Sequence, residues 1–210
     1  MSRETTASPS SGFASLPTGS WGKPPPGFFG RDAVSLARGL LGCLLTSLVS
    51  GEVTSGVIVE TEAYTQDDQA SHSRCGPTAR NHTMFQPGGR AYVYVSYGIH
   101  HCFNVTSGPA GRGEAVLIRA LEPRAGVELM AQRRGKEGLK ELCSGPGKLC
   151  QALGITTEHC GGSLREPPLF VLAPHVPFSI RIASTRRIGI SRAVDLPRRF
   201  TVAGSSFLSR

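Results

Sequence analysis

Residues 57–64 read Val57-Ile58-Val59-Glu60-Thr61-Glu62-Ala63-Tyr64, a run of β-branched, acidic and aromatic residues that predicts a β-strand. Successive side chains of a strand point to opposite faces, so Glu60, Glu62 and Tyr64 are expected to share one face. If that face is poorly hydrated, each carboxylate raises the pKa of the other. A carboxylate beside an aromatic ring is a candidate general base next to a stacking surface. A solvated strand face with ordinary charges is the alternative interpretation.

The chain before this strand predicts a helix and a second strand. Asp32 is a suitable N-cap for the helix, and Gly42 ends it. Residues 43–49 then predict a strand, which is joined to the strand of residues 53–64 through a turn at residues 50–51. Such a short turn places the two strands antiparallel.

The chain after this strand first predicts a long polar loop at residues 65–90, and loops of this length are often functional. Further strands are predicted at residues 91–96, 102–106, 114–121, 178–183 and 198–203, helices at 126–134 and 146–154, and a loop at 155–177. Strands outnumber helices and connect mainly by hairpins. The sequence therefore predicts an α+β fold, a single domain with a mostly antiparallel curved sheet, flanking helices and a protruding β-hairpin.

The domain boundary is expected near Phe28. Residues 1–27 are rich in Ser, Thr, Pro and Gly and are predicted to form a flexible tail, whereas residues 28–210 form the domain. No apolar run reaches the ~20 residues of a membrane helix, and no secretory signal is visible. A soluble, intracellular protein that does not enter membranes is expected.

The overall charge favours an anionic partner. The formal net charge is +8, and nucleic acid is the commonest partner of so basic a domain, although many basic proteins bind none. Of the six cysteines, no two form a C-x-x-C pair, and reduced, buried thiols are expected. His100 and His101 are adjacent in a strand and point to opposite faces, so no metal site is predicted.

Aromatic residues mark the predicted hairpin. Tyr92 and Tyr94 share one face of the strand, where ordinary sheet packing would also explain them. Tyr97, followed by Gly98 at the tip, is a candidate wedge that enters a base stack, or else a half-buried turn residue. Arg119 lies in an apolar strand and needs a partner, for which a buried Glu would serve.

Several motifs in this order resemble the alkyladenine (3-methyladenine) DNA glycosylase family. They are Val59-Glu60-Thr61-Glu62-Ala63-Tyr64, Ala70-Ser71-His72-Ser73, Tyr92-Val93-Tyr94, Tyr97-Gly98, Asn104, Ile118-Arg119-Ala120-Leu121-Glu122-Pro123 and Leu142-Cys143-Ser144-Gly145-Pro146. The resemblance runs from about Phe28 to the C-terminus. It implies a single α+β domain that holds duplex DNA on a basic face.

The resemblance also implies two catalytic residues and a backbone contact beside them. Glu62 resembles the general base that deprotonates the attacking water, and Arg119 resembles the arginine that helps to hold that carboxylate and the water. The backbone of Ile188 matches a position that contacts the same water.

Two further groups follow from the resemblance. Tyr64, Tyr94 and His72 look like the walls of a pocket for a flipped base, and Asn104 resembles the residue that crowds the 2-amino group of guanine. Tyr97 looks like the intercalating tyrosine. The expected DNA contacts beside it are Gly98, Ile99 and Lys148.

The implied activity is that of a monofunctional DNA N-glycosylase in base excision repair. It would release 3-methyladenine, 7-methylguanine and, as further substrates, ethenoadenine and hypoxanthine from double-stranded DNA, as a monomer with neither metal nor cofactor. It would act in the cytoplasm, at the nucleoid, in a bacterium and in the nucleus in a eukaryote. A non-catalytic lesion-binding DNA protein is the main alternative. A carbohydrate hydrolase using Glu60 and Glu62 is disfavoured, because neighbours on one strand cannot flank a bond from opposite sides.

Overall fold

Strand β3 (Thr54–Tyr64) runs through the middle of the sheet and has three neighbours. The computed structural model describes residues 20–176 and 179–209. Strand β6 (Ala115–Ala125) pairs along one edge of β3, while β2 (Leu44–Ser47) and β9 (Arg199–Val202) share the other edge. All but the last residue of β3 is buried. The strand predicted from residues 53–64 is thus the centre of the fold.

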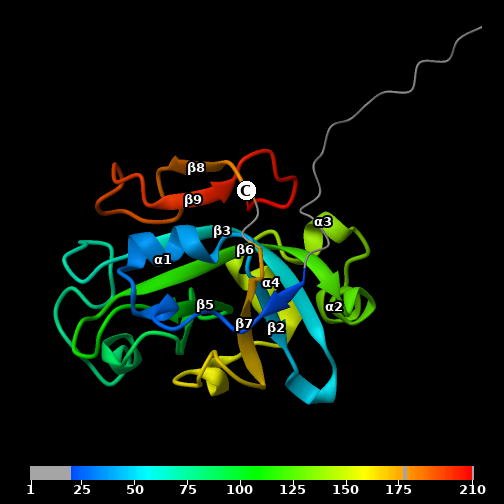
Figure 1. Ribbon diagram of the computed structural model, residues 1–210, viewed down its shortest axis with the longest axis horizontal. Helices are drawn as coiled ribbons and strands as arrows, with labels where there is room; N and C mark the ends of the chain where they lie inside the picture. Colours follow the sequence, from blue (N-terminus) through cyan, green and yellow to red (C-terminus); the bar gives the residue numbers. More distant parts are fainter. Residues whose placement is uncertain (1–19, 177–178, 210) are drawn as a thin grey trace, which may run out of the picture.

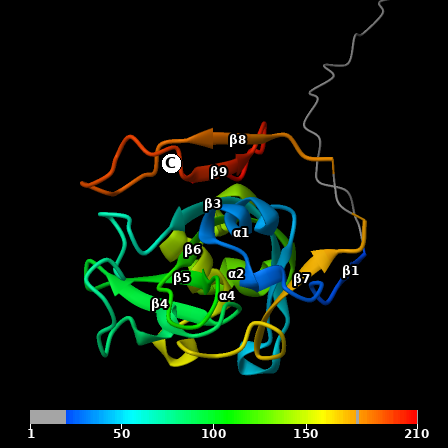
Figure 2. The same cartoon turned by 60° about the vertical axis from the view of Figure 1, so that its left-hand side comes forward.

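Within residues 20–176 and 179–209, the sheet has nine strands, and every pairing is antiparallel. Its order is β1-β7-β2-β3-β6-β5-β4, with β9 attached to β3 and β8 to β9. The remaining strands are β1 (Trp21–Gly22), β4 (Ala91–Ser96), β5 (His100–Thr106), β7 (Leu169–Pro174) and β8 (Ile182–Thr185). The β8–β9 hairpin lies above β3 in two different views (Figures 1 and 2). The predicted α+β class with a mostly antiparallel sheet is confirmed.

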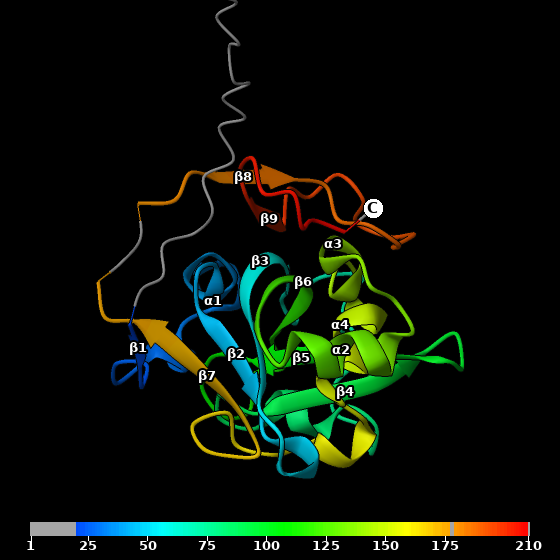
Figure 3. The same ribbon diagram turned by 90° about the vertical axis from the view of Figure 1, so that its right-hand side faces the viewer.

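Four α-helices complete the described part of the domain. They are α1 (Ala33–Leu40), α2 (Val127–Arg134), α3 (Leu139–Leu142) and α4 (Pro146–Leu153). The Asp32 carboxylate accepts the Ser35 N–H at 2.9 Å, so the predicted N-cap of α1 is confirmed. Helix α1 packs on β3 and β6, whereas α2, α3 and α4 gather in one group on the right-hand side of Figure 3. Buried Leu36 and Leu149 show that both groups contribute to the core.

Two strands lie where the sequence predicted irregular chain. Strand β1 falls within the predicted tail, and β7 falls within the loop predicted at residues 155–177. They pair with each other, Trp21 opposite Pro174, and β7 also pairs with β2. Strand β1 has only two residues, which is too few to show a periodic pattern. Strand β7 is a short apolar run flanked by prolines, and such a run carries little periodic signal of its own. The prediction was therefore wrong there, while residues 1–19 and 177–178 lie outside the described residues.

Irregular pairing between β3 and β6 sets the direction of one important side chain. Glu60 lies opposite Ala120, and Thr61 lies opposite Ile118, so Arg119 is an extra residue at a bulge. A bulge re-aims the side chain it carries, and bulges often lie next to active sites. The alternation of a regular strand does not predict this displacement.

The turn between β4 and β5 projects beyond the body of the molecule, as Figure 3 shows at its right-hand edge. Tyr97 and Gly98 form the turn with positive φ angles of 50° and 74°. A left-handed conformation at Gly costs little, but at Tyr it is strained. The predicted protruding hairpin is confirmed. Among the described residues, no helix is long and apolar enough to cross a membrane.

Candidate active site

A pocket of about 690 Å³ opens between the sheet and two loops. Strands β3 to β6 form its floor, the loop after β3 contributes His72, and the loop after β8 contributes residues 188–192. Its volume falls within the range of small-molecule sites. The residues predicted to bind the substrate all line it, as does the predicted catalytic Arg119; the former are Tyr64, His72, Tyr94, Asn104 and Ile188.

A row of paired residues crosses four strands beneath this pocket. Glu62 lies opposite Leu117, Leu117 opposite Asn104, and Asn104 opposite Tyr92. Paired residues of antiparallel strands point to the same face. The topology of the sheet therefore brings together residues that are far apart in the sequence.

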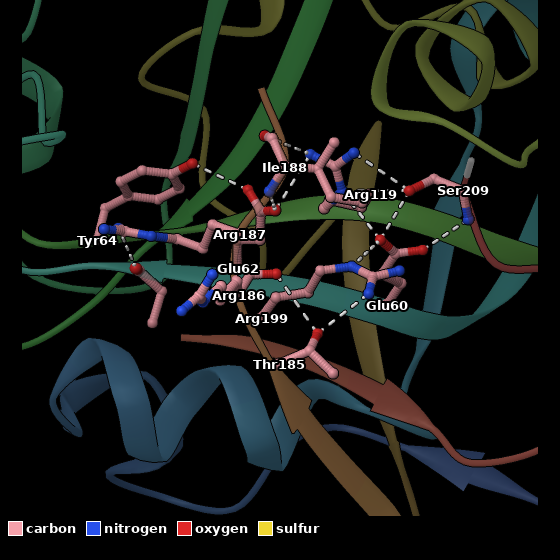
Figure 4. Close-up of polar contacts among 11 residues, drawn as sticks. Glu60, Glu62, Tyr64, Arg119, Thr185, Arg186, Arg187, Ile188, Arg199 and Ser209 are labelled. Carbon is pink, nitrogen blue, oxygen red and sulfur yellow. Dashed lines mark hydrogen bonds and ion pairs between the residues drawn. The ribbon is translucent and has the colours of Figure 1, made fainter. Parts of the chain in front are cut away.

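Glu62 lies immediately behind the pocket wall rather than in it. The residue has no exposed surface. One carboxylate oxygen, Oε1, accepts the Ile188 N–H at 2.8 Å and is 3.2 Å from Nη1 of Arg119. The other oxygen, Oε2, accepts the Tyr64 hydroxyl at 2.9 Å (Figure 4). A carboxylate offers about four acceptor positions, so these three donors leave one position on Glu62 for a further donor.

Tyr64 is the hydroxyl donor of this group. Burial, followed by the adjacent Glu62 charge, raises the pKa of Tyr64 above its ordinary range. The hydroxyl therefore stays protonated and donates to the carboxylate. Its ring lines the pocket.

Glu60 shares a face with Glu62, as predicted, and Arg119 joins the two. Nε of Arg119 donates to Oε1 of Glu60 at 2.9 Å. The mutual rise in pKa expected for the two carboxylates does not hold at Glu60. Burial works to raise the pKa of Glu60, but hydrogen bonds from Arg199 and Ser209 hold it below its ordinary value. The predicted buried Glu partner of Arg119 is confirmed, and Arg119 pairs with two glutamates, Glu60 and Glu62.

A buried ion pair fixes the loop that carries Ile188. Arg187 precedes Ile188 and binds both oxygens of Asp68, and its side chain has no exposed surface. Its Nη1 also donates to the Ala63 carbonyl at 3.0 Å. Arg187 therefore binds the chain both before and after Tyr64, at Ala63 and at Asp68, and holds the loop after β8 against the end of β3.

Aromatic rings form one wall of the pocket. The His72 ring lies 4.6 Å from the Tyr94 ring, and its Nδ1 is 2.9 Å from the Tyr92 hydroxyl. Partial desolvation, reinforced by the charge of Arg80, lowers the pKa of His72. The imidazole is therefore mainly neutral at neutral pH, and the positive charge of this wall is that of Arg80, whose guanidinium carbon lies 5.7 Å from the centre of the Tyr94 ring.

Asn104 is held rigidly in the pocket floor. It is buried, and its Nδ2 donates to the carbonyls of Tyr92 at 3.0 Å and Cys102 at 3.3 Å. Two bonds from one amide nitrogen fix the side chain in a single orientation. Any molecule that enters the pocket must fit around it.

The expected DNA contacts lie on the surface around the pocket. Tyr97 is 87% exposed and Ile99 is 73% exposed at the hairpin turn. Two large exposed side chains so close together at one turn are candidates for a binding surface. Lys148 is exposed on α4, whose first residue, Pro146, lines the pocket.

Sequence reasoning missed Asp68, Arg187, Arg199 and Ser209, all of which support the site through long-range contacts. The cysteines of the described residues are free, and Cys75 is exposed, contrary to the expectation of burial. No group of His, Cys, Asp and Glu in residues 20–176 and 179–209 is arranged to hold a metal.

The class of protein that this fold and pocket define is the DNA glycosylases, hydrolases of N-glycosyl bonds. More narrowly, residues 27–206 match the methylpurine-DNA glycosylase family, and the chain belongs to it. The resemblance predicted from the ordered motifs is thus confirmed.

Relatives of similar length support the same assignment. The chain is 51% identical over 189 residues to a protein of Methanoculleus marisnigri, covering 89% of this chain and 98% of that one. It is 52% identical over 182 residues to a protein of Nitrosospira multiformis, covering 87% and 91%. It is 53% identical over 197 residues to one of Granulibacter bethesdensis, covering 93% and 90%. Each is described as a candidate 3-methyladenine DNA glycosylase.

Proposed function

We propose that the chain is a monofunctional glycosylase that flips a damaged purine out of duplex DNA and hydrolyses its N-glycosidic bond. The proposed substrates are 3-methyladenine, as in the names of its relatives, and 7-methylguanine, with ethenoadenine and hypoxanthine as further candidates. The observation that carries the proposal is the Glu62 carboxylate, held by Arg119, Ile188 and Tyr64 against the inner wall of an aromatic pocket.

Glu62 is proposed to act as the general base. As the glycosidic bond breaks, its electron pair leaves with the base, and the sugar becomes oxocarbenium-like. A negative carboxylate nearby stabilises this charge and accepts a proton from the water that adds to the sugar. Since Glu62 has no exposed surface in this conformation, the Tyr64 hydroxyl or the Ile188 loop must yield slightly to admit the water.

The pocket is proposed to select bases that leave easily. Alkylation at N3 or N7 makes the purine positively charged, and electron-rich rings such as those of Tyr64 and Tyr94 attract a cation. Stacking on such rings contributes ~1–3 kcal/mol per base. The lowered pKa of His72 supports this proposal, because a neutral imidazole does not repel the cation.

The absence of a nearby amine supports a monofunctional reaction. A glycosylase that also cleaves the strand needs an amine nucleophile to form a Schiff base with the sugar. Among the described residues that line the pocket, none is a lysine. Water is therefore the proposed nucleophile, and the product is an abasic site in an intact strand.

The exposed turn is proposed to keep the damaged base out of the helix. Tyr97 would fill the gap left by the flipped nucleotide, while Gly98, Ile99 and Lys148 contact the duplex around it. The basic charge of the chain, +8, supplies attraction to phosphates. We propose that one molecule acts alone and without metal or cofactor.

The deciding experiment is a single-turnover assay on duplex DNA that contains one lesion. Wild type is expected to release the base, and Glu62→Gln is expected to be at least 100-fold slower, since a positioned general base contributes about 10²–10⁴ in rate. Glu122→Gln is a matched control, because Glu122 is also a mostly buried glutamate paired with an arginine, Arg124. It should retain wild-type activity.

The same assay tests the alternative. A wild-type protein that binds lesion DNA but releases none of the four bases would be a lesion-binding protein, and the proposed enzyme activity would be wrong. Equal rates for wild type and Glu62→Gln would instead show that another group activates the water.

A further inference from the structure

Glu60 is a buried charged residue that has no part in the reaction just described. It has no exposed surface and is not among the residues that line the pocket. Its carboxylate nevertheless accepts hydrogen bonds from three residues: Arg119 and Arg199 each donate an Nε–H, at 2.9 and 2.8 Å, and Ser209 donates twice. So many donors around one carboxylate indicate a fixed, ionised group.

Ser209 closes this cluster from the C-terminal segment. Its N–H donates to Oε2 of Glu60 at 2.6 Å, and its hydroxyl lies 2.7 Å from Oε1. Arg119 in turn donates Nε–H and Nη2–H to the Ser209 hydroxyl oxygen, at 3.3 and 3.2 Å. The residue is buried, and Figure 4 shows it on the far side of Arg119 from Tyr64.

Arg119 therefore has two sides with different partners. Its Nε and Nη2 are turned to Glu60 and Ser209, which leaves Nη1 for the Oε1 atom of Glu62 at 3.2 Å. An arginine without such restraint prefers to bind a carboxylate with two parallel hydrogen bonds, one to each oxygen. That arrangement would occupy the Oε2 atom of Glu62, which the proposed reaction needs for the water.

We infer that Glu60 and Ser209 are positioning residues that hold Arg119 to a single contact with Glu62. They keep the Oε2 side of the general base open to the Tyr64 hydroxyl and the water. This inference rests on the proposed function, because it assigns a role in the step that Glu62 performs. Neither residue touches the pocket, so each acts on the rate through Arg119 and not on the binding of DNA.

The test compares Ser209→Ala with Ser205→Ala, a serine of the same segment whose hydroxyl oxygen accepts the Phe207 N–H. Single-turnover base release and the affinity for lesion DNA are measured for both, with the thermal midpoint as a check on folding. Ser209→Ala is expected to be about tenfold slower, the usual effect of removing a hydrogen bond to a charged group, with unchanged affinity. Ser205→Ala should match wild type in both measurements.

A double-mutant cycle separates positioning from a general structural effect. In an Arg119→Gln background, Ser209→Ala should cause no further loss of rate, because the residue through which it acts is gone. If the Glu60→Gln variant folds, it should also release the base more slowly, and it should cause no further loss of rate in the Arg119→Gln background. If it does not fold, the Ser209→Ala variant alone decides the test.

Three outcomes would overturn the inference. They are an unchanged rate in Ser209→Ala, an equal loss in Ser205→Ala, and a tenfold loss that persists in the Arg119→Gln background. A wild-type protein without base release would overturn the proposed function as well, whereas an active wild type with these outcomes leaves it intact.

Discussion

Arg187 lies over the ring of Tyr64, with its guanidinium carbon 4.6 Å from the ring centroid. The same guanidinium is paired with Asp68 in the protein interior. Tyr64 is therefore fixed at its hydroxyl by Glu62 and at its ring by a cation that cannot move. A wall held at both points can present one defined surface to a base.

Removal of Asp68 should destabilise the protein more than removal of Arg187. Asp68→Asn leaves the Arg187 charge buried without a carboxylate, which typically costs about 3–5 kcal/mol of the free energy of unfolding. Arg187→Met should cost less, because Arg198 still lies 3.1 Å from the Asp68 carboxylate. Urea unfolding of the two variants measures the order. A larger loss in Arg187→Met would contradict it.

Tyr97→Ala should weaken the binding of lesion DNA without affecting the fold. The side chain is 87% exposed and the backbone has a φ of 50°, so its loss removes no packing and leaves the strained turn as it is. A lost stacking contact corresponds to about tenfold weaker affinity. Fluorescence anisotropy and thermal unfolding give the two values. Val176→Ala, at a valine that is 76% exposed, is the control. Unchanged affinity in Tyr97→Ala would remove the wedge role.

Asn104→Ser should widen the range of bases that the pocket accepts. The shorter side chain cannot maintain both Nδ2 bonds, to Tyr92 and Cys102, and it leaves space in the pocket floor. Release of guanine from undamaged duplex DNA is expected to rise relative to release of 3-methyladenine. A ratio equal to that of wild type would show that Asn104 does not exclude the guanine amino group.

Stability should fall at acidic pH, in part because of Glu60. Burial alone would raise the pKa of Glu60, but the hydrogen bonds from Arg199 and Ser209 together lower it by more than burial raises it. The pKa of Glu60 in the folded protein therefore lies below the ordinary value of 4.5. A group with a depressed folded pKa contributes its stability above the unfolded value and loses it as the pH falls through the folded value. The free energy of unfolding should therefore decline below about pH 4.5.

Asp68 follows the same rule, since hydrogen bonds and the charge of Arg187 outweigh burial and lower its pKa. Urea unfolding from pH 7 to pH 3 should show a shallower decline in Glu60→Gln, which has lost one of the titrating groups. Parallel curves for wild type and Glu60→Gln would mean that Glu60 contributes nothing to the acid sensitivity.

The sequence predicted those features of the site that depend on local periodicity. The shared face of Glu60, Glu62 and Tyr64 follows from alternation along one strand, and the exposed Tyr97 follows from a two-strand pattern with a short turn. The roles of these residues came from the resemblance of ordered motifs.

Features that depend on distant contacts were not predictable in this way. The bulge at Arg119 arises from the pairing of β3 with β6, and no residue type marks it in the sequence. Asp68 and Arg187 are 119 positions apart, and each is an ordinary charged residue until the fold buries them together. Strand β7 was missed because its sheet partners, not its own pattern, define it.

The bond between the Ile188 N–H and Glu62 joins residues 126 positions apart. Closing so long a loop carries a large entropic cost, and non-local contacts of this kind form slowly. Catalytic competence should therefore be among the last properties that the chain acquires when it refolds from denaturant. The rate of base release should therefore recover later than the far-ultraviolet circular dichroism of the sheet. Recovery of activity would then measure the final folding step.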